Sequence, residues 1–191
     1  ASIHAPIGNY VVSLAGRLDV NNAQASDNAE EFVQVNPTQS ITQLNPGVSA
    51  GIKRDLGENF NAGLWFASVK RSGSITERFI NYFPVGVDPY EMLGNPDLAP
   101  ETNNQVDLVF GFSKSKITAE VNLFAAYLNN YITAEKTELK PRIPTSPGVR
   151  QYVNFDRAVK TGFEAAFSQA LFYGISHQLM VAYTYGQNLV I

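Results

Sequence analysis

Apolar and polar residues alternate along much of this chain, most clearly over residues 117–132. Glu120 and Asn122 fall between the apolar positions of that run. A period of two predicts a β-strand whose two faces meet different surroundings. A helix is the competing interpretation, since Ala, Glu and Leu favour helices, but these two polar residues interrupt the stripe that an amphipathic helix needs. The strand is therefore favoured, with its apolar face formed by Ile117, Ala119, Val121, Leu123, Ala125 and Tyr127.

The same alternation recurs in six further segments, which lie at about 9–20, 46–54, 60–70, 103–113, 150–169 and 175–186. Their lengths exceed the ~5–6 residues usual for strands of globular proteins. Long connections at about 21–43, 71–101 and 134–149 alternate with short turns at about 55–59, 113–116 and 172–174. Long loops at one end and tight turns at the other are typical of an outer-membrane β-barrel, with lipid outside and a polar lumen inside.

The predicted fold is therefore all-β, an antiparallel up-and-down meander of about seven strands that belongs to a larger transmembrane barrel. An open sheet edge cannot be satisfied in hydrocarbon, so we expect further strands that this sequence lacks. The sequence begins just before one predicted strand and stops just after another, and no signal peptide is visible. We therefore expect residues 1–191 to be part of a longer protein.

Composition excludes several classes of function. Charged residues make up only 16% of the 191 residues, and the net charge of −3 provides no basic surface for nucleic acid. The absence of cysteine excludes disulfides and thiolate metal sites. No run approaches the ~20 apolar residues of a membrane helix. Hydropathy alone would suggest a soluble protein, but transmembrane strands give only a weak signal of that kind.

A stiff polar segment, Gly94–Glu101, precedes the strand predicted at 103–113. Asn95 and Ala99 both stand before a proline, which restricts them to extended conformations. The two prolines also lack backbone donors, so neither a helix nor a sheet interior suits the segment. We expect it to be the end of a long connection, where it stiffens the return of the chain into the sheet without contacting a ligand. The motif residues are Asn95, Pro96, Asp97, Leu98, Pro100 and Glu101.

This segment resembles the GNPDLKPE signature in the barrel of TonB-dependent outer-membrane receptors, with Ala99 in place of a frequent basic residue. Other segments are similar to the same family in the expected order, so the resemblance covers nearly the whole chain. They are Ala67–Ser72, Asn122–Tyr127 with Tyr131 and Ile132, Tyr152–Ala158 with Gly162–Glu164, and Ala182–Tyr185.

The resemblance implies a plugged barrel of about 22 strands in the outer membrane of a Gram-negative bacterium. Members import scarce nutrients such as ferric siderophores, haem, copper complexes, cobalamin or glycans. Energy reaches them from TonB through an N-terminal region, which, like the plug and the C-terminal strands, is absent from residues 1–191. The implied partners are outer-membrane lipid, TonB and a metal chelate or other small nutrient, with no nucleic acid and no cofactor.

The connection at 71–94 holds the best candidate ligand contacts, namely Arg71, Glu77, Arg78 and Tyr82. Arginine and aromatic side chains in an extracellular loop could hold a ferric chelate by charge and stacking. The alternative is a packed loop that contains a salt bridge.

Other chemistry is not indicated by the sequence. The two histidines, His4 and His177, and the two methionines, Met92 and Met180, lack the spacing of a metal site. The carboxylates Asp88, Glu91, Asp97 and Glu101 lie among prolines and glycines, which favours turn formation over acid–base catalysis. We predict no catalytic residue, no metal site and no enzyme. The alternative function is a soluble or secreted β-sandwich or β-propeller that serves in binding or adhesion.

Overall fold

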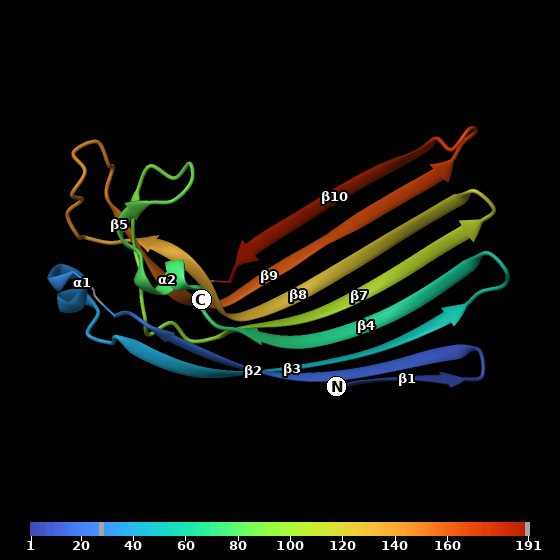
Figure 1. The fold of residues 1–191 in the computed structure, drawn as a ribbon, viewed down its shortest axis with the longest axis horizontal. Coiled ribbons are helices and arrows are strands. Elements are labelled where there is room, and N and C mark those ends of the chain that lie inside the picture. The colour runs from blue at the N-terminus through green and yellow to red at the C-terminus, as the bar shows by residue number, and fades with distance from the viewer. Residues whose placement is uncertain (27–28, 190–191) are drawn as a thin grey trace.

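The computed structural model describes residues 1–26 and 29–189. Long antiparallel strands make up most of the chain, and two short helices lie in the connections between them (Figure 1). The strands are β1 Ser2–Ile7, β2 Tyr10–Gln24, β3 Ser40–Asp55, β4 Phe60–Arg71, β5 Asn81–Pro84, β6 Glu91–Leu93, β7 Glu101–Lys114, β8 Ile117–Lys136, β9 Val149–Ala170 and β10 Ser176–Asn188. The helices are α1 Glu30–Val35 and α2 Ile75–Phe79.

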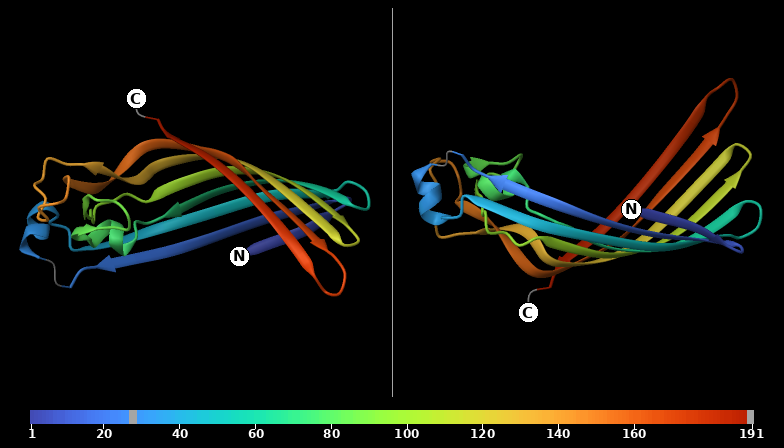
Figure 2. Two further views of the ribbon diagram at one scale, coloured as in Figure 1. Left: turned by 90° about the horizontal axis from the view of Figure 1, so that it is seen from above. Right: turned by 60° about the horizontal axis from the view of Figure 1, so that its bottom comes forward.

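One continuous sheet contains all these strands, in the order β1-β2-β3-β4-β7-β8-β9-β6-β5, and β10 also pairs with β9. We call β1, β2, β3, β4, β7, β8, β9 and β10 the wall strands; each pairs antiparallel with its neighbour in sequence among the wall strands. Two further views show how the wall twists and curves (Figure 2). The predicted all-β antiparallel meander is confirmed.

The structure adds one wall strand to the predicted set. Segment β1 pairs with β2 from Ser2 to Ile7, but it is short and contains Pro6, so its alternation was too weak to predict it. The first long connection is also shorter than expected. Asn22 on β2 and Thr42 on β3 still pair and share a side-chain hydrogen bond of 2.8 Å. Both strands are polar there, so hydropathy does not reveal that they continue.

The two faces of the wall differ as the sequence predicts. On one face, here called the outer face, large apolar side chains are exposed; they include Leu14, Val48, Leu64, Val106, Leu108, Leu123, Phe163 and Tyr183. On β8 the outer apolar run from Ile117 to Tyr127 is 11 residues long, which corresponds to roughly 33 Å along a strand. With a strand tilt of ~40° this run spans about 25 Å, the height of the lipid-facing band of an outer-membrane barrel.

The opposite face, here called the inner face, is polar and includes aromatic rings that cover glycines. Trp65 pairs with Gly51, and a Cβ at Gly51 would lie only 1.9 Å from the Trp65 ring. Phe124 covers Gly162 in the same way, at 2.8 Å from a hypothetical Cβ. Glycine at these two positions allows a large ring to lie flat along the sheet. No helix in the described residues is long and apolar enough to cross a membrane.

Candidate functional site

The three long connections gather at one end of the wall, while the short turns lie at the other end (Figure 1). We call residues 29–39, 72–100 and 137–148 the cap. Its buried core contains Phe32 and Leu93, which pack with Val149 at the start of β9, and Phe79, Tyr82 and Leu139 surround them. Short strand β6 joins the cap to the wall because it pairs in parallel with the start of β9, from Glu91 to Leu93. The cap is therefore a packed structure that all three connections build together.

The motif Asn95–Glu101 fastens the cap to the wall. Asn95 donates from Nδ2 to the backbone oxygen of Tyr152 at 3.1 Å, and its side-chain oxygen accepts from Asp97 N at 3.0 Å. Asn154 on β9 accepts from Ala99 N at 2.8 Å and donates back to the Ala99 oxygen at 3.0 Å. The predicted place of the motif is confirmed, because it ends the connection where β7 begins at Glu101.

Two buried residues strengthen this attachment. Leu98 is fully buried, and its backbone oxygen accepts a hydrogen bond of 2.7 Å from Gln43 on β3. Gly94, the first residue of the signature, lies against helix α2. A Cβ at that position would stand 2.4 Å from the backbone oxygen of Arg78, so no larger residue fits without movement of backbone.

Arg71 joins the two ends of the longest connection. It lies opposite Glu101 in the β4–β7 pair. Its guanidinium contacts Glu77 at 2.9 Å and Glu101 at 3.3 Å. The other oxygen of Glu101 accepts from Ile132 N at 2.9 Å. Two of the predicted ligand contacts, Arg71 and Glu77, are thus brought together and bonded to each other.

Glu77 also forms a capping box at the start of α2, where its carboxylate accepts from Ser74 N at 2.6 Å and Ser74 Oγ accepts from Glu77 N. Burial by itself raises the pKa of Glu77, but the hydrogen bonds from Arg71 and Ser74 outweigh it and hold the pKa below its usual 4.5. The negative carboxylate is therefore the form that stabilises the beginning of α2.

Arg78, the third predicted contact, is fully buried. Its Nε donates to the backbone oxygen of Gly73 at 2.9 Å, and Nη2 donates to the side-chain oxygen of Gln43. Burial lowers the pKa of Arg78. In this arrangement Arg78 links the base of α2 to β3, and its guanidinium is enclosed by the cap.

Tyr82, the fourth predicted contact, is half-buried and carries Arg142 over its ring at 3.9 Å. Arg142 comes from the third connection and keeps 41% of its side chain exposed. A second pair of this kind stands nearby in sequence, with Arg150 over Tyr90 at 4.1 Å and bonded to Asp88 at 2.8 Å. Sequence analysis missed Arg142, Arg150 and Tyr90, because they meet their partners across separate connections.

The four carboxylates near the motif do not converge on one point. Glu91 is fully buried and accepts hydrogen bonds from the backbone N–H groups of Arg142, at 3.0 Å, and Ile143. Asp88 pairs with Arg150, Glu101 pairs with Arg71, and Asp97 stays exposed. Each carboxylate therefore has a separate place, three of them in the cap and Glu101 at the start of β7.

The histidines and methionines, the remaining candidate metal ligands, lie on the wall and in the cap. His4 Nδ1 and Ser13 Oγ share a hydrogen bond of 2.8 Å. His177 lies beside Phe167, with ring centroids 5.8 Å apart. Met92 is buried in β6, while Met180 is exposed on β10. No group of three potential His, Cys, Asp or Glu ligands occurs within the described residues.

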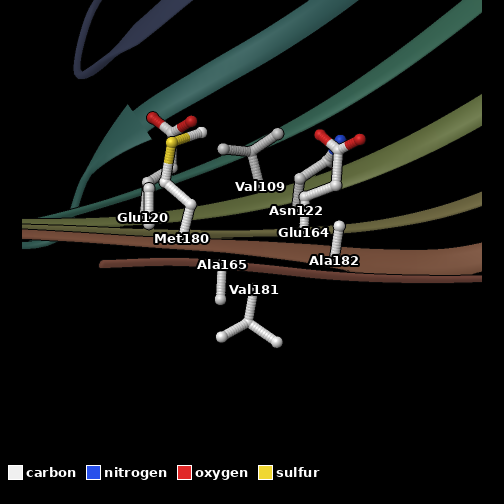
Figure 3. A pocket seen from close by; sticks show the side chains of 9 residues that line it. Val109, Glu120, Asn122, Glu164, Ala165, Met180, Val181 and Ala182 are labelled. Atoms are coloured by element: carbon white, nitrogen blue, oxygen red, sulfur yellow. The ribbon is translucent and has the colours of Figure 1, made fainter. Parts of the chain in front are cut away.

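A shallow pocket of about 390 Å³ lies on the inner face, far along the strands from the cap. Glu120, Glu164 and Met180 reach into the same space, while Val181 points to the other side of the sheet (Figure 3). Asn122 lies opposite Glu164 and donates to Asp107 at 3.2 Å. This part of the inner face is polar and rich in carboxylates.

No curated protein sequence matches the chain. Among solved structures, the copper transporter OprC superposes with a TM-score of 0.71 at 18% identity, over 96% of this chain and 27% of OprC. The siderophore receptor PirA from Pseudomonas aeruginosa gives 0.61 at 15% identity, over 98% of this chain and 42% of PirA. The ferric enterobactin receptor PfeA from the same organism, in complex with enterobactin, gives 0.57 at 13% identity, over 97% and 34% of the two chains.

The chain therefore spans between about a quarter and two fifths of the length of these three solved proteins. The β-sandwich and β-propeller alternatives are wrong, since the wall strands pair antiparallel in one continuous sheet that matches part of a barrel. A family profile described as "TonB dependent receptor-like, beta-barrel" matches residues 3–190. The chain belongs to the TonB-dependent receptor family and forms part of its β-barrel domain.

Proposed function

We propose that this chain contributes eight consecutive wall strands and three extracellular loops to an outer-membrane transporter that imports a ferric siderophore, haem or another metal complex, with energy delivered by TonB. Membership of the family supports the transporter. Similar structures include a copper transporter and receptors for siderophores. The short turns then face the periplasm and the cap faces the outside.

The observation that carries this proposal is the packed cap, which the three long connections build against inner-face residues such as Gln43 and Asn154. A solute that approaches from the long-loop end meets the cap before it meets the carboxylate-rich part of the inner face. A preformed surface binds with less ordering cost than a flexible loop.

We propose that Tyr82 and Arg142 contact the ligand directly. The ring and the guanidinium are stacked at 3.9 Å, the guanidinium also contacts Glu31 at 3.8 Å, and Phe83, the next residue of β5, is 68% exposed. Such a surface suits a ligand with aromatic rings and negative charge, because guanidinium groups pair with anions and stack on rings. Arg71, Glu77 and Arg78 then hold the loop that presents Tyr82, and the motif holds the loop to the wall.

The test uses the full-length receptor in a strain that lacks the native gene. Uptake and equilibrium binding of radiolabelled ferric chelates are measured for the wild type and for Tyr82→Ala/Arg142→Gln. Loss of the ring and the charge is expected to weaken binding of the accepted chelate about tenfold, since each such contact is worth roughly 0.5–2 kcal/mol.

The matched control is Tyr173→Ala/Lys140→Gln, which removes a ring from the opposite end of the wall and an exposed cation from the connection that holds Arg142. It should bind like the wild type. Failure of every iron, haem and copper complex to enter cells through the wild-type receptor would refute the metal-complex proposal. Equal binding by the two variants would instead refute the roles of Tyr82 and Arg142.

A further inference from the structure

Backbone contacts fix both members of the Tyr82–Arg142 stack. Tyr82 is the extra residue where the β5–β6 register shifts between Asn81 and Phe83, and it has a left-handed φ of 52°. Tyrosine rarely adopts this conformation, and a bulge changes the direction of a side chain, so the surrounding structure holds the ring where it lies. Buried Glu91 accepts from the backbone N–H of Arg142 at 3.0 Å. The ring and the guanidinium therefore keep their places whatever else the guanidinium contacts.

A carboxylate from another connection contacts the same guanidinium. Glu31 Oε2 on α1 lies 3.8 Å from Arg142 Nη2, which is longer than a hydrogen bond. The Glu31 side chain is 64% exposed and that of Arg142 is 41% exposed. An exposed pair at this separation is held weakly, because water and salt screen both charges. Glu31 thus contacts the group that would pair with an anionic ligand, and the contact is easily broken.

The second stack in the cap has a different counter-ion. Arg150, over the Tyr90 ring, contacts Asp88 at 2.8 Å. Asp88 also accepts from Tyr90 N at 3.0 Å, and only 29% of its side chain is exposed. This carboxylate is fixed by its own turn, in the same connection as the ring. Within residues 1–26 and 29–189, Arg142 has no counter-ion that is held so closely.

The helix that carries Glu31 is anchored without this ion pair. Phe32 is fully buried in the core of the cap. At the end of α1, Asn36 donates to the backbone oxygen of Gly94 at 3.2 Å and accepts from Gln151 at 3.1 Å. The Glu31 side chain can therefore turn away from the guanidinium while α1 stays in place. Its displacement breaks the ion pair and leaves the packing of the cap intact.

We propose that Glu31 is an internal competitor for the ligand: its carboxylate pairs with Arg142 in the empty receptor, and a negatively charged ligand displaces it. The inference rests on the proposed function, which places the ligand on the Tyr82–Arg142 stack. The ion pair stabilises the empty site, so only the fraction of receptors with a free guanidinium binds an anion, and the apparent affinity falls by that fraction. A neutral ligand leaves the pair intact, so Glu31 does not affect its affinity. Glu31 therefore limits how tightly the cap holds an anionic ligand that a transporter must release.

The test measures equilibrium binding of radiolabelled ferric tris-catecholate and ferric tris-hydroxamate chelates to the full-length receptor. The first probe is negatively charged and aromatic, whereas the second is neutral. Glu31→Gln is expected to bind the tris-catecholate about two- to fivefold more tightly, the range that an exposed ion pair supplies, and its affinity for the tris-hydroxamate should not rise. The matched control is Glu30→Gln, which removes the same charge from the preceding, exposed residue of α1 and should change neither affinity.

A second comparison tests whether the gain depends on Arg142. Addition of Glu31→Gln to Arg142→Gln should give no further gain, since the guanidinium for which Glu31 competes is absent. Hydrogen exchange of residues 29–39 in Glu31→Gln should match the wild type, because Phe32 and Asn36 hold α1. Faster exchange there, without a gain in affinity, would show that the ion pair holds the cap together and does not compete with a ligand.

Four other results would overturn the proposal: an unchanged or weaker affinity of Glu31→Gln for the tris-catecholate, an equal gain in Glu30→Gln, the same gain in the Arg142→Gln background, or no binding of the tris-catecholate to either the wild type or Glu31→Gln. Each of these leaves the proposed function standing if another metal complex enters cells through the receptor. Equal binding of the tris-catecholate by the wild type and Arg142→Gln would instead refute the ligand contact of Arg142 itself.

Discussion

Glu91 makes a sharp test of how the cap is held together. It is fully buried in β6, and its two carboxylate oxygens accept from the backbone N–H groups of Arg142 and Ile143 in the third connection. Replacement by glutamine keeps the shape but leaves one neutral acceptor, and it turns an NH₂ group toward the second N–H. Hydrogen bonds to charged groups contribute about 1.5–3 kcal/mol each, and neutral ones about 1 kcal/mol.

Replacement of two charged hydrogen bonds by one neutral bond therefore costs about 3 kcal/mol, because Glu91 is fully buried. If this cost falls on local opening of residues 137–148, their opening equilibrium rises by about 100-fold. Hydrogen exchange of the full-length receptor, read by mass spectrometry on peptides from this connection, measures the change directly. Peptides from β8 below the cap should exchange as in the wild type.

Glu138→Gln is the matched control, since Glu138 is exposed in the same connection and loses the same charge. Its exchange should match the wild type within about twofold. Unchanged exchange of residues 137–148 in Glu91→Gln would refute the inference that this carboxylate clamps the third connection. Equal acceleration in both variants would show that net charge, and not the buried hydrogen bonds, controls opening.

Three further outcomes follow from the same contacts. Gly94→Ala should loosen α2 and speed proteolysis of residues 72–100, because its Cβ would stand 2.4 Å from the Arg78 backbone oxygen, whereas Gly186→Ala, with 3.8 Å of clearance, should not. Leu123→Arg on the outer face should destabilise the folded barrel by about 2–4 kcal/mol and reduce its amount. Asn122→Arg on the inner face should fold normally. Equal amounts of folded protein, measured by heat-dependent electrophoretic mobility, would contradict the assignment of the faces. The folded pKa of Glu77 lies below 4.5, so its stabilisation of α2 is present above pH 4.5 and is lost as the pH falls through that lower pKa. The protection of residues 74–80 against hydrogen exchange, corrected for the intrinsic rate at each pH, should fall with acid in the wild type but stay low and nearly constant in Glu77→Gln.

The sequence predicted the wall well because alternation is a local property. On β8, each residue from Ile117 to Tyr127 shows its face by its own polarity. The pattern fails where both faces are polar, as at Asn22 and Thr42, and at the short, proline-containing β1. The place of the motif was also predictable, since Pro96 and Pro100 exclude a helix or a central strand whatever surrounds them.

The contacts of the cap were not predictable from local pattern. The local sequence around Arg78 is typical of an exposed loop, yet the structure buries Arg78 against Gln43, which lies 35 residues away along the chain. Tyr82 and Arg142 meet only because β6 pairs with the beginning of β9 and brings two connections together. The role of Glu91 depends in the same way on backbone groups more than 50 residues away.

The sequence by itself determined the family, the two-faced wall strands and the end at which the long connections lie. The period of the hydrophobic pattern, the positions of the prolines and the loop lengths are local properties that can be taken directly from the sequence. Only the tertiary structure decided which charged side chains are enclosed, which carry exposed stacks, and which cations line up across strands. Register sets those relations: Lys70 and Arg157 share a row only through the pairing of four strands. Hydrogen bonds between distant backbones fix that register, and no short segment contains them.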